Sequence, residues 1–133
     1  PARCLTLLGA DLIVLPTNWP PGAQTAAEFA INTRAMENTV YYAAVNRIGV
    51  ERGTPFIGRS RICDPLGKTI ATASGVEDVI LYADIDVARS RNKHLIRQKG
   101  ANEVNRIADR RPDMYDEIIK PHSLKSPRDL KGE

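Results

Sequence analysis

Two cysteines and two histidines are the side chains that could support nucleophilic catalysis, namely Cys4, Cys63, His94 and His122. A cysteine nucleophile needs a base close by, because the thiolate and not the thiol attacks. Both histidines lie in the basic C-terminal region, whereas Cys4 falls on an apolar helical segment and Cys63 at a strand end. The spacing therefore favours two reduced, buried thiols used in packing over a Cys–His pair.

Metal and nucleotide sites have recognisable spacings, and this sequence carries none of them. It has no CxxC, no HxxxH, no GxGxxG and no GxxxxGK(S/T) pattern. Asp84 and Asp86 lie two residues apart before a predicted helix, where capping is a sufficient role. We therefore predict neither a metal nor a cofactor.

Glu37 is the acid of most interest, because it falls on the expected packed side of an Ala-rich helix. That side is a stripe at helical spacing made of Ala26, Phe29, Ala30, Thr33 and Glu37. A carboxylate at a packed edge must be paired or hydrogen-bonded, and Arg34 lies three residues earlier. We expect a structural salt bridge between Arg34 and Glu37, with a role in ordering a nearby site as the alternative.

Short helices and strands would position these residues within one domain. Helices are expected over residues 2–8, 24–38 and after Asp86, and strands over residues 12–15, 40–45, 56–63, 69–73 and 79–85, with a turn at 64–67. Residues 12–15 are apolar throughout, which predicts a strand buried on both faces. The result is an α+β fold. One or two helices cannot cover both faces of its sheet, so further polypeptide or a second subunit must complete it.

Composition and charge agree with one globular domain. The chain has 133 residues, 42% of them hydrophobic, and its apolar runs are too short to cross a bilayer. Residues 1–88 carry 7 Lys or Arg against 9 Asp or Glu, and residues 89–133 carry 12 against 7. Acids interleaved with these cations favour a solvated or subunit-contacting tail over a nucleic-acid site. Without a signal peptide, we expect a cytoplasmic protein that binds neither membrane nor nucleic acid.

Seven short motifs occur in an order that resembles a known family. They are Pro1-Ala2-Arg3 through Leu8-Gly9-Ala10-Asp11-Leu12-Ile13, Pro16-Thr17-Asn18-Trp19-Pro20, Arg34-Ala35-Met36-Glu37-Asn38, Ala44-Val45-Asn46-Arg47-Ile48-Gly49, Phe56-Ile57-Gly58-Arg59-Ser60-Arg61-Ile62, Asp64-Pro65-Leu66-Gly67 and Arg110-Arg111-Pro112-Asp113-Met114-Tyr115. Each motif is weak alone, but together over residues 1–115 they resemble the C-terminal half of the nitrilase superfamily, the carbon–nitrogen hydrolases.

The resemblance implies half of an α-β-β-α sandwich, completed by an N-terminal half and by subunit pairing. It also implies a cysteine nucleophile, a glutamate general base and acid, and an oxyanion-stabilising lysine, all expected upstream of Pro1, so that this chain alone would be inactive. Asn18 and Trp19 match the loop that walls the substrate pocket, the alternative being a turn with a packed Trp. Glu37 and Asn38 match a helix motif with an ordering rather than a catalytic role.

The sequence thus predicts the C-terminal half of a carbon–nitrogen hydrolase over residues 1–115 and a polar tail over residues 116–133. The expected substrate is a nitrile or a non-peptide amide, hydrolysed through a Cys thioester without a cofactor. The expected assembly is a homodimer or a larger homo-oligomer. The alternative is a truncated or split subunit that pairs with another polypeptide and does no chemistry.

Overall fold

A four-stranded sheet organises the part of the chain that the computed structural model describes, residues 1–129. Its strands are β1 (Leu12–Thr17), β2 (Tyr41–Asn46), β5 (Arg61–Cys63) and β6 (Thr69–Thr72), in the spatial order β1-β2-β5-β6. β1 and β2 run parallel, and the other two pairs are antiparallel. The end of the predicted polar tail, residues 130–133, lies outside the described residues.

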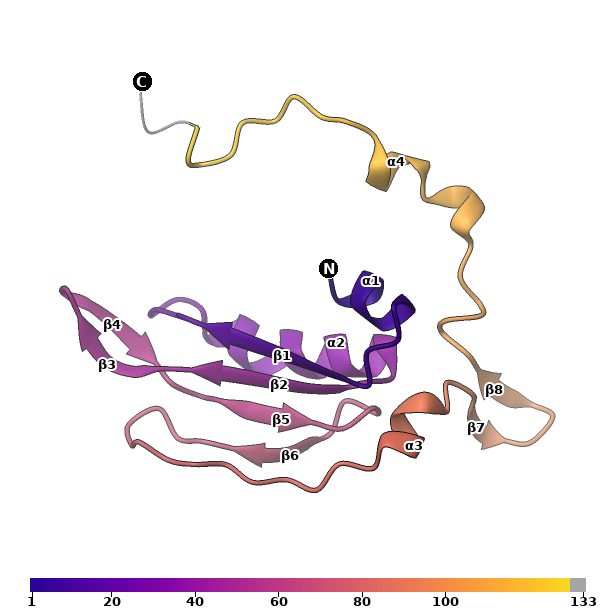
Figure 1. The fold of residues 1–133 in the computed structure, drawn as a ribbon, viewed down its shortest axis with the longest axis horizontal. Helices are drawn as coiled ribbons and strands as arrows, with labels where there is room; N and C mark the ends of the chain where they lie inside the picture. The colour runs from indigo at the N-terminus through magenta and orange to yellow at the C-terminus, as the bar shows by residue number, and fades with distance from the viewer. Residues whose placement is uncertain (130–133) are drawn as a thin grey trace.

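Helices and hairpins complete the fold. α1 (Ala2–Leu7) precedes β1, and α2 (Ile31–Asn38), entered through the π-helical turn η1 (Ala26–Ala30), connects β1 to β2 (Figure 1). The remaining elements are the hairpins β3 (Ile48–Glu51) with β4 (Thr54–Ile57) and β7 (Leu95–Gln98) with β8 (Asn102–Val104), α3 (Val87–Arg91), the 3-10 turn η2 (Pro112–Met114) and α4 (Asp116–Ile119). The mixture of helices and strands confirms the predicted α+β class.

α2 covers one face of the sheet and forms the core with it. Ile31 and Ala35 of α2 are buried against Ile13 of β1 and Tyr42 of β2. Side chains on a strand alternate between its two faces, so Tyr42 and Ala44 point to α2 while their neighbours point away. This alternation places the core cluster that includes Ile13, Tyr42 and Ala44 on the α2 side of the sheet, while Tyr41 is buried on the other side.

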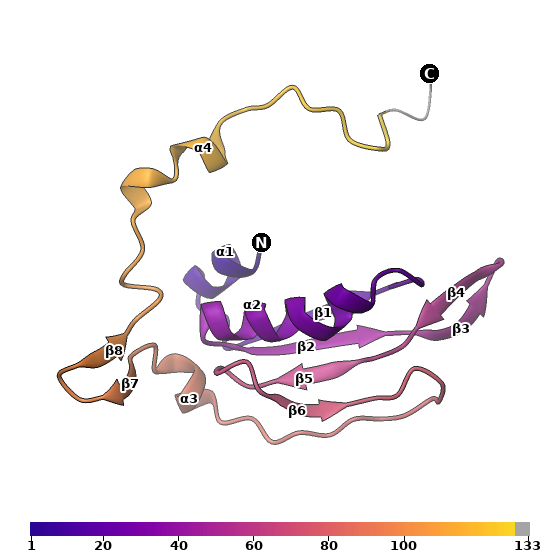
Figure 2. The same cartoon turned by 180° about the vertical axis from the view of Figure 1, so that it is seen from behind.

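The opposite face of the sheet remains open over β1. Leu12 is 38% exposed, and Val14 and Val45 are each 55% exposed. In Figure 1 this face of β1 and β2 is toward the viewer, and Figure 2 shows α2 on the other side of these strands; the chain after β8 leads away from the sheet. The prediction that residues 12–15 are buried on both faces is therefore wrong for this chain, because only one layer is present to cover the strand.

The buried side of α2 differs from the predicted stripe. Phe29 is 60% exposed, whereas Ala27, Ile31 and Ala35 are almost fully buried. The two stripes are one residue apart, about 100° around a helix, and both are made mainly of small and apolar residues. Periodicity alone could not separate them; the contact with β2 decides which one is buried.

Two predicted strands also differ from the structure. The expected strand over residues 56–63 is broken between β4 and β5, because Gly58 and Arg59 adopt positive φ angles of 59° and 60°. The expected strand over residues 79–85 has no ladder partner among the described residues, although part of it lies along the open face near Ala43 and Ile62. The helix cap at Asp86 is confirmed, since its carboxylate accepts from the Ala88 N–H at 2.9 Å.

We predict that Ile31→Ala lowers the free energy of unfolding by about 2–4 kcal/mol, since it leaves a cavity between α2 and the sheet. Phe29→Ala in η1, the turn that leads into α2, should cost less than about 1 kcal/mol, because that ring is largely exposed. Urea titration followed by far-ultraviolet circular dichroism measures both. A larger loss for Phe29→Ala would mean that the predicted stripe is the packed one.

Candidate functional site

The loop after β1 starts at the same edge of the sheet at which β2 ends. Thr17 is in register with Asn46, and both strands run in the same direction. Loops at the carboxyl ends of neighbouring parallel strands are common sites for pockets. Asn18 lies exposed in this loop, and Trp19 is half-buried against the core.

The Asn46 side chain holds this loop to the sheet. It is almost fully buried, and its Oδ1 accepts from the Trp19 N–H at 2.8 Å. Its Nδ2 donates to the Gly58 carbonyl at 2.8 Å and to the Trp19 carbonyl at 3.4 Å. One amide therefore uses both hydrogens and its oxygen to join two segments that are distant in the sequence.

The main chain of Asn46 is fixed as well. Its N–H donates to the Ser60 hydroxyl at 2.9 Å, and that hydroxyl donates back to the Asn46 carbonyl at 3.0 Å. The Trp19 carbonyl also accepts from the Ile57 N–H at 3.0 Å. These contacts form a clamp, which we define as Asn46 with Trp19, Gly58 and Ser60.

Gly58 is required at its position in the clamp. Its φ of +59° lies in the left-handed region, and a Cβ there would stand 2.7 Å from the Ile48 Cγ2 and 2.9 Å from the Gly75 Cα. No ordinary side chain tolerates both constraints. The turn it makes ends β4 and leaves the Gly58 carbonyl within reach of the Asn46 amide.

A polar cavity of about 310 Å³ adjoins the clamp. Asn46 and Arg47 line it together with Ser60, and Glu77 and Asp78 also contribute. Arg47 is ion-paired with Glu51, and its guanidinium lies 4.7 Å over the Phe56 ring. These charged walls suit a small polar molecule rather than an apolar one.

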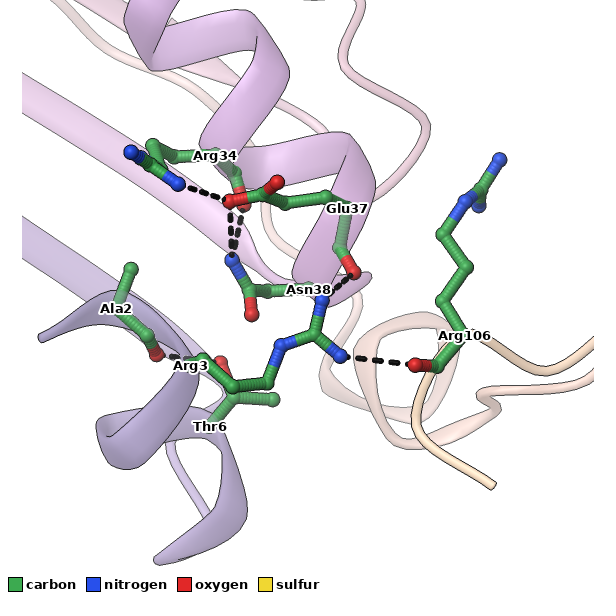
Figure 3. A network of polar contacts seen from close by, with 7 residues as sticks. All are labelled: Ala2, Arg3, Thr6, Arg34, Glu37, Asn38 and Arg106. Carbon is green, nitrogen blue, oxygen red and sulfur yellow. Dashed lines mark hydrogen bonds and ion pairs between the residues drawn. The ribbon is translucent and has the colours of Figure 1, made fainter. Parts of the chain in front are cut away.

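Glu37 and Asn38 lie in a second polar network, at the end of α2 (Figure 3). The Arg34 guanidinium donates to the Glu37 carboxylate at 2.5 Å, which confirms the predicted salt bridge. This hydrogen bond raises the pKa of Arg34 above its ordinary value. The buried Asn38 amide donates to the Arg34 carbonyl at 2.9 Å and closes the last turn of the helix.

Arg3 ties α1 to this network. Its guanidinium donates to the Glu37 carbonyl at 2.7 Å and to the Arg106 carbonyl at 2.8 Å. It thereby joins the first turn of α1, the end of α2 and the segment after β8 (Figure 3). Cations are favoured at a helix C-terminus because carbonyls without helical partners collect there.

The predicted site residues therefore form two groups that the structure does not bring together. Asn38 precedes the first residue of β2, Tyr41, whereas the Trp19 loop is held at its last residue, Asn46. Five residues of extended strand span about 17 Å. From the sequence alone, Asn46 had no expected role beyond its place in a family motif, and the usable signal was an amide directly after the apolar and aromatic run of residues 40–45.

Neither cysteine is placed for catalysis. Cys63 is buried, and burial raises the pKa of its thiol, which disfavours the thiolate. Cys4 is exposed, so the prediction that it is buried is wrong; α1 packs through Ala2 and Thr6 instead. His94 pairs with Glu103 across the β7–β8 hairpin at 2.6 Å.

The described residues contain no cluster of three or more His, Cys, Asp or Glu side chains that could hold a metal ion. A search of the same residues finds no helix with the length and hydropathy needed to span a membrane.

Comparison with known proteins adds to this geometry. The carbon–nitrogen hydrolase family matches residues 1–94. This chain belongs to the carbon–nitrogen hydrolase family. A nitrilase of Pyrococcus abyssi is 39% identical over 115 residues, covering 86% of this chain and 40% of the relative. The chain spans about two-fifths of the length of the curated relatives it matches.

Solved structures of carbon–nitrogen hydrolases also match the fold. A carbon–nitrogen hydrolase from Helicobacter pylori G27 aligns with a TM-score of 0.73 at 30% identity, covering 90% of this chain and 44% of that one. A variant of an amidase from Nesterenkonia sp. AN1 aligns with a TM-score of 0.54 at 27% identity, covering 56% of this chain and 28% of that one. That structure is described as showing covalent addition of the acetamide moiety of fluoroacetamide at the active-site cysteine. The chain thus matches part of the nitrilase fold.

We predict that a thiol reagent labels Cys4 and spares Cys63 in the folded chain, because Cys63 is buried and its thiol pKa is raised. Mass spectrometry after iodoacetamide treatment at pH 8 should find one adduct in the native protein and two in urea. A Cys4→Ser variant should take up none until urea is added. Rapid native labelling of that variant would contradict the assignment.

We predict that Glu37→Gln lowers the free energy of unfolding by less than about 1 kcal/mol, because its ion pair with Arg34 is partly exposed. Arg3→Met should cost about 2 kcal/mol, since it removes two charge-assisted hydrogen bonds to main-chain carbonyls. Urea titration orders the two variants. The reverse order would place the stabilising contact in the Arg34–Glu37 pair.

Proposed function

We propose that the complete protein hydrolyses a nitrile or a non-peptide amide through a cysteine thioester. The observation that carries this proposal is the family match over residues 1–94, in which the parallel β1–β2 pair and its loop are retained. The amidase adduct with fluoroacetamide supports a cysteine nucleophile in a relative of this fold. The expectation of a non-catalytic split subunit is not favoured beside these hydrolases.

The proposed reaction follows the chemistry of acyl transfer. The thiolate would attack the carbon of the nitrile or amide, and ammonia or an amine would leave after protonation. For a nitrile, thiolate attack would give a thioimidate, and one water would add to its carbon–nitrogen double bond before ammonia leaves and the thioester forms. Water then cleaves the thioester, releasing the carboxylic acid and the free thiol. The nucleophile, the glutamate acid and base, and the oxyanion-stabilising lysine would come from polypeptide beyond these residues.

Within this chain, we assign supporting roles. Asn18 and Trp19 would form one wall of the substrate pocket, since their loop begins at the carboxyl edge of β1. Glu37 and Asn38 would act indirectly, because their network holds α1 through Arg3. Residues 1–115 would belong to the hydrolase domain and residues 116–133 to a tail that contacts another copy in a cytoplasmic homo-oligomer. The exposed Ile118 and Ile119 support such a contact.

We predict that the complete protein releases ammonia from at least one compound in a panel of nitriles, ω-amides and N-carbamoyl compounds, whereas residues 1–133 alone release none. Fluoroacetamide should add the mass of one acetamide group to the complete protein and none to the isolated chain. Ammonia assay and intact-mass spectrometry test the two parts. Adduct formation on Cys4 or Cys63 with turnover by the isolated chain would overturn the proposal.

A variant of the loop tests its role as a pocket wall. Trp19→Ala in the complete protein should raise KM about tenfold with a smaller change in kcat, whereas Trp19→Phe should retain most activity because an aromatic wall remains. Equal KM and kcat values for both variants and the parent would show that Trp19 does not line the pocket.

A further inference from the structure

We propose that Asn46 is a positioning residue that sets the place of the Asn18–Trp19 loop, and through it the affinity for substrate. This inference rests on the proposed function, because it takes that loop as a wall of the substrate pocket. Asn46 itself need not touch substrate. Its side chain is buried, and its three contacts all go to main-chain atoms of Trp19 and Gly58.

The chemistry of the amide explains why this position requires Asn. The Trp19 N–H needs an acceptor, while the Gly58 and Trp19 carbonyls need donors. Only a side-chain amide offers both within one planar group. An aspartate of the same shape would keep the acceptor but set a carboxylate oxygen against two carbonyl oxygens. A buried polar contact that is half-satisfied is worse than none.

The loop has few other connections to the sheet. Besides the Asn46 amide, the Trp19 main chain is held by the N–H of Ile57, which is the last residue of β4 and directly precedes Gly58. Both connections therefore meet at the same strand break. The Asn18 side chain makes no hydrogen bond to another described residue and lies exposed. Loss of the amide would let the first residues of the loop move, and displacements of about 1 Å in a substrate-positioning group reduce catalysis strongly.

A second asparagine provides a matched control. The half-buried Asn32 donates through Nδ2 to the Gly67 carbonyl and to the Thr69 hydroxyl, each at 2.8 Å. It fastens α2 to the β5–β6 turn, and its side chain makes no hydrogen bond to the Trp19 loop. Asn46→Asp and Asn32→Asp each place a carboxylate oxygen against main-chain carbonyls that now accept from the amide, those of Gly58 and Trp19 in one variant and that of Gly67 in the other. The Asn32 Oδ1 also accepts from the Arg61 guanidinium at 3.0 Å, a contact that a carboxylate keeps. They differ in which segment they release.

The experiment compares the two variants in the complete protein. Trp19 is the single Trp of this chain, and its emission is isolated by subtracting a Trp19→Phe control. Asn46→Asp should shift Trp19 emission to longer wavelength and raise iodide quenching about twofold, as the loop opens to water. With the nitrile or amide that the protein hydrolyses fastest, it should raise KM about tenfold and change kcat less than about threefold. Asn32→Asp should change none of these.

The outcomes separate the two proposals. Unchanged emission and KM in Asn46→Asp, or the same changes in Asn32→Asp, would overturn the positioning role. If Asn46→Asp does not fold, Ser60→Ala takes its place, because it removes the two hydroxyl contacts to the Asn46 main chain and should shift emission and KM in the same direction. If the parent protein hydrolyses none of the panel, the proposed function fails, while the emission comparison still decides whether Asn46 holds the loop.

Discussion

The parallel pairing of β1 with β2 sets the geometry on which the rest of the structure depends. Six residues of each strand are in register, from Leu12 opposite Tyr41 to Thr17 opposite Asn46. Parallel strands need a crossover connection, which α2 supplies on one face of the sheet. The same pairing brings the Trp19 loop and the Asn46 amide to one edge. A shift of one residue in the register of β2 would turn the Asn46 side chain toward the open face and remove the clamp.

Because α2 covers only one face of the sheet, the core lies on that face and apolar side chains are exposed on the other. α2 buries Ile31 and Ala35 against the strands, while Val14 and Val45 remain open on the other side. Apolar side chains on an uncovered sheet face are costly in water. In the four-layer sandwich that the family resemblance implies, a second sheet would cover this face. The open face is therefore consistent with a chain that matches about two-fifths of its relatives' length.

The two polar networks serve different elements of one fold. The clamp at Asn46 fixes a loop at the carboxyl edge, and the network at Glu37 fixes α1 at the other end of β2. In both, a side chain fixes the segment by hydrogen bonds to main-chain groups, from the Asn46 amide in the clamp and from the Arg3 guanidinium in the other network. Such contacts are directional, and they contribute more than the partly exposed Arg34–Glu37 pair.

The sequence by itself determined the local features of this protein. Turn chemistry at Asp64-Pro65-Leu66-Gly67, the cap at Asp86 and the Arg34–Glu37 pair depend on neighbours within four residues, and each was predictable. The ordered motifs likewise indicated the family. The tertiary structure alone decided which side of α2 is buried, where the strand breaks at Gly58, and that Asn46 holds Trp19. Those features join residues that are distant in the chain, so their energies depend on the packed arrangement and leave no periodic pattern to read.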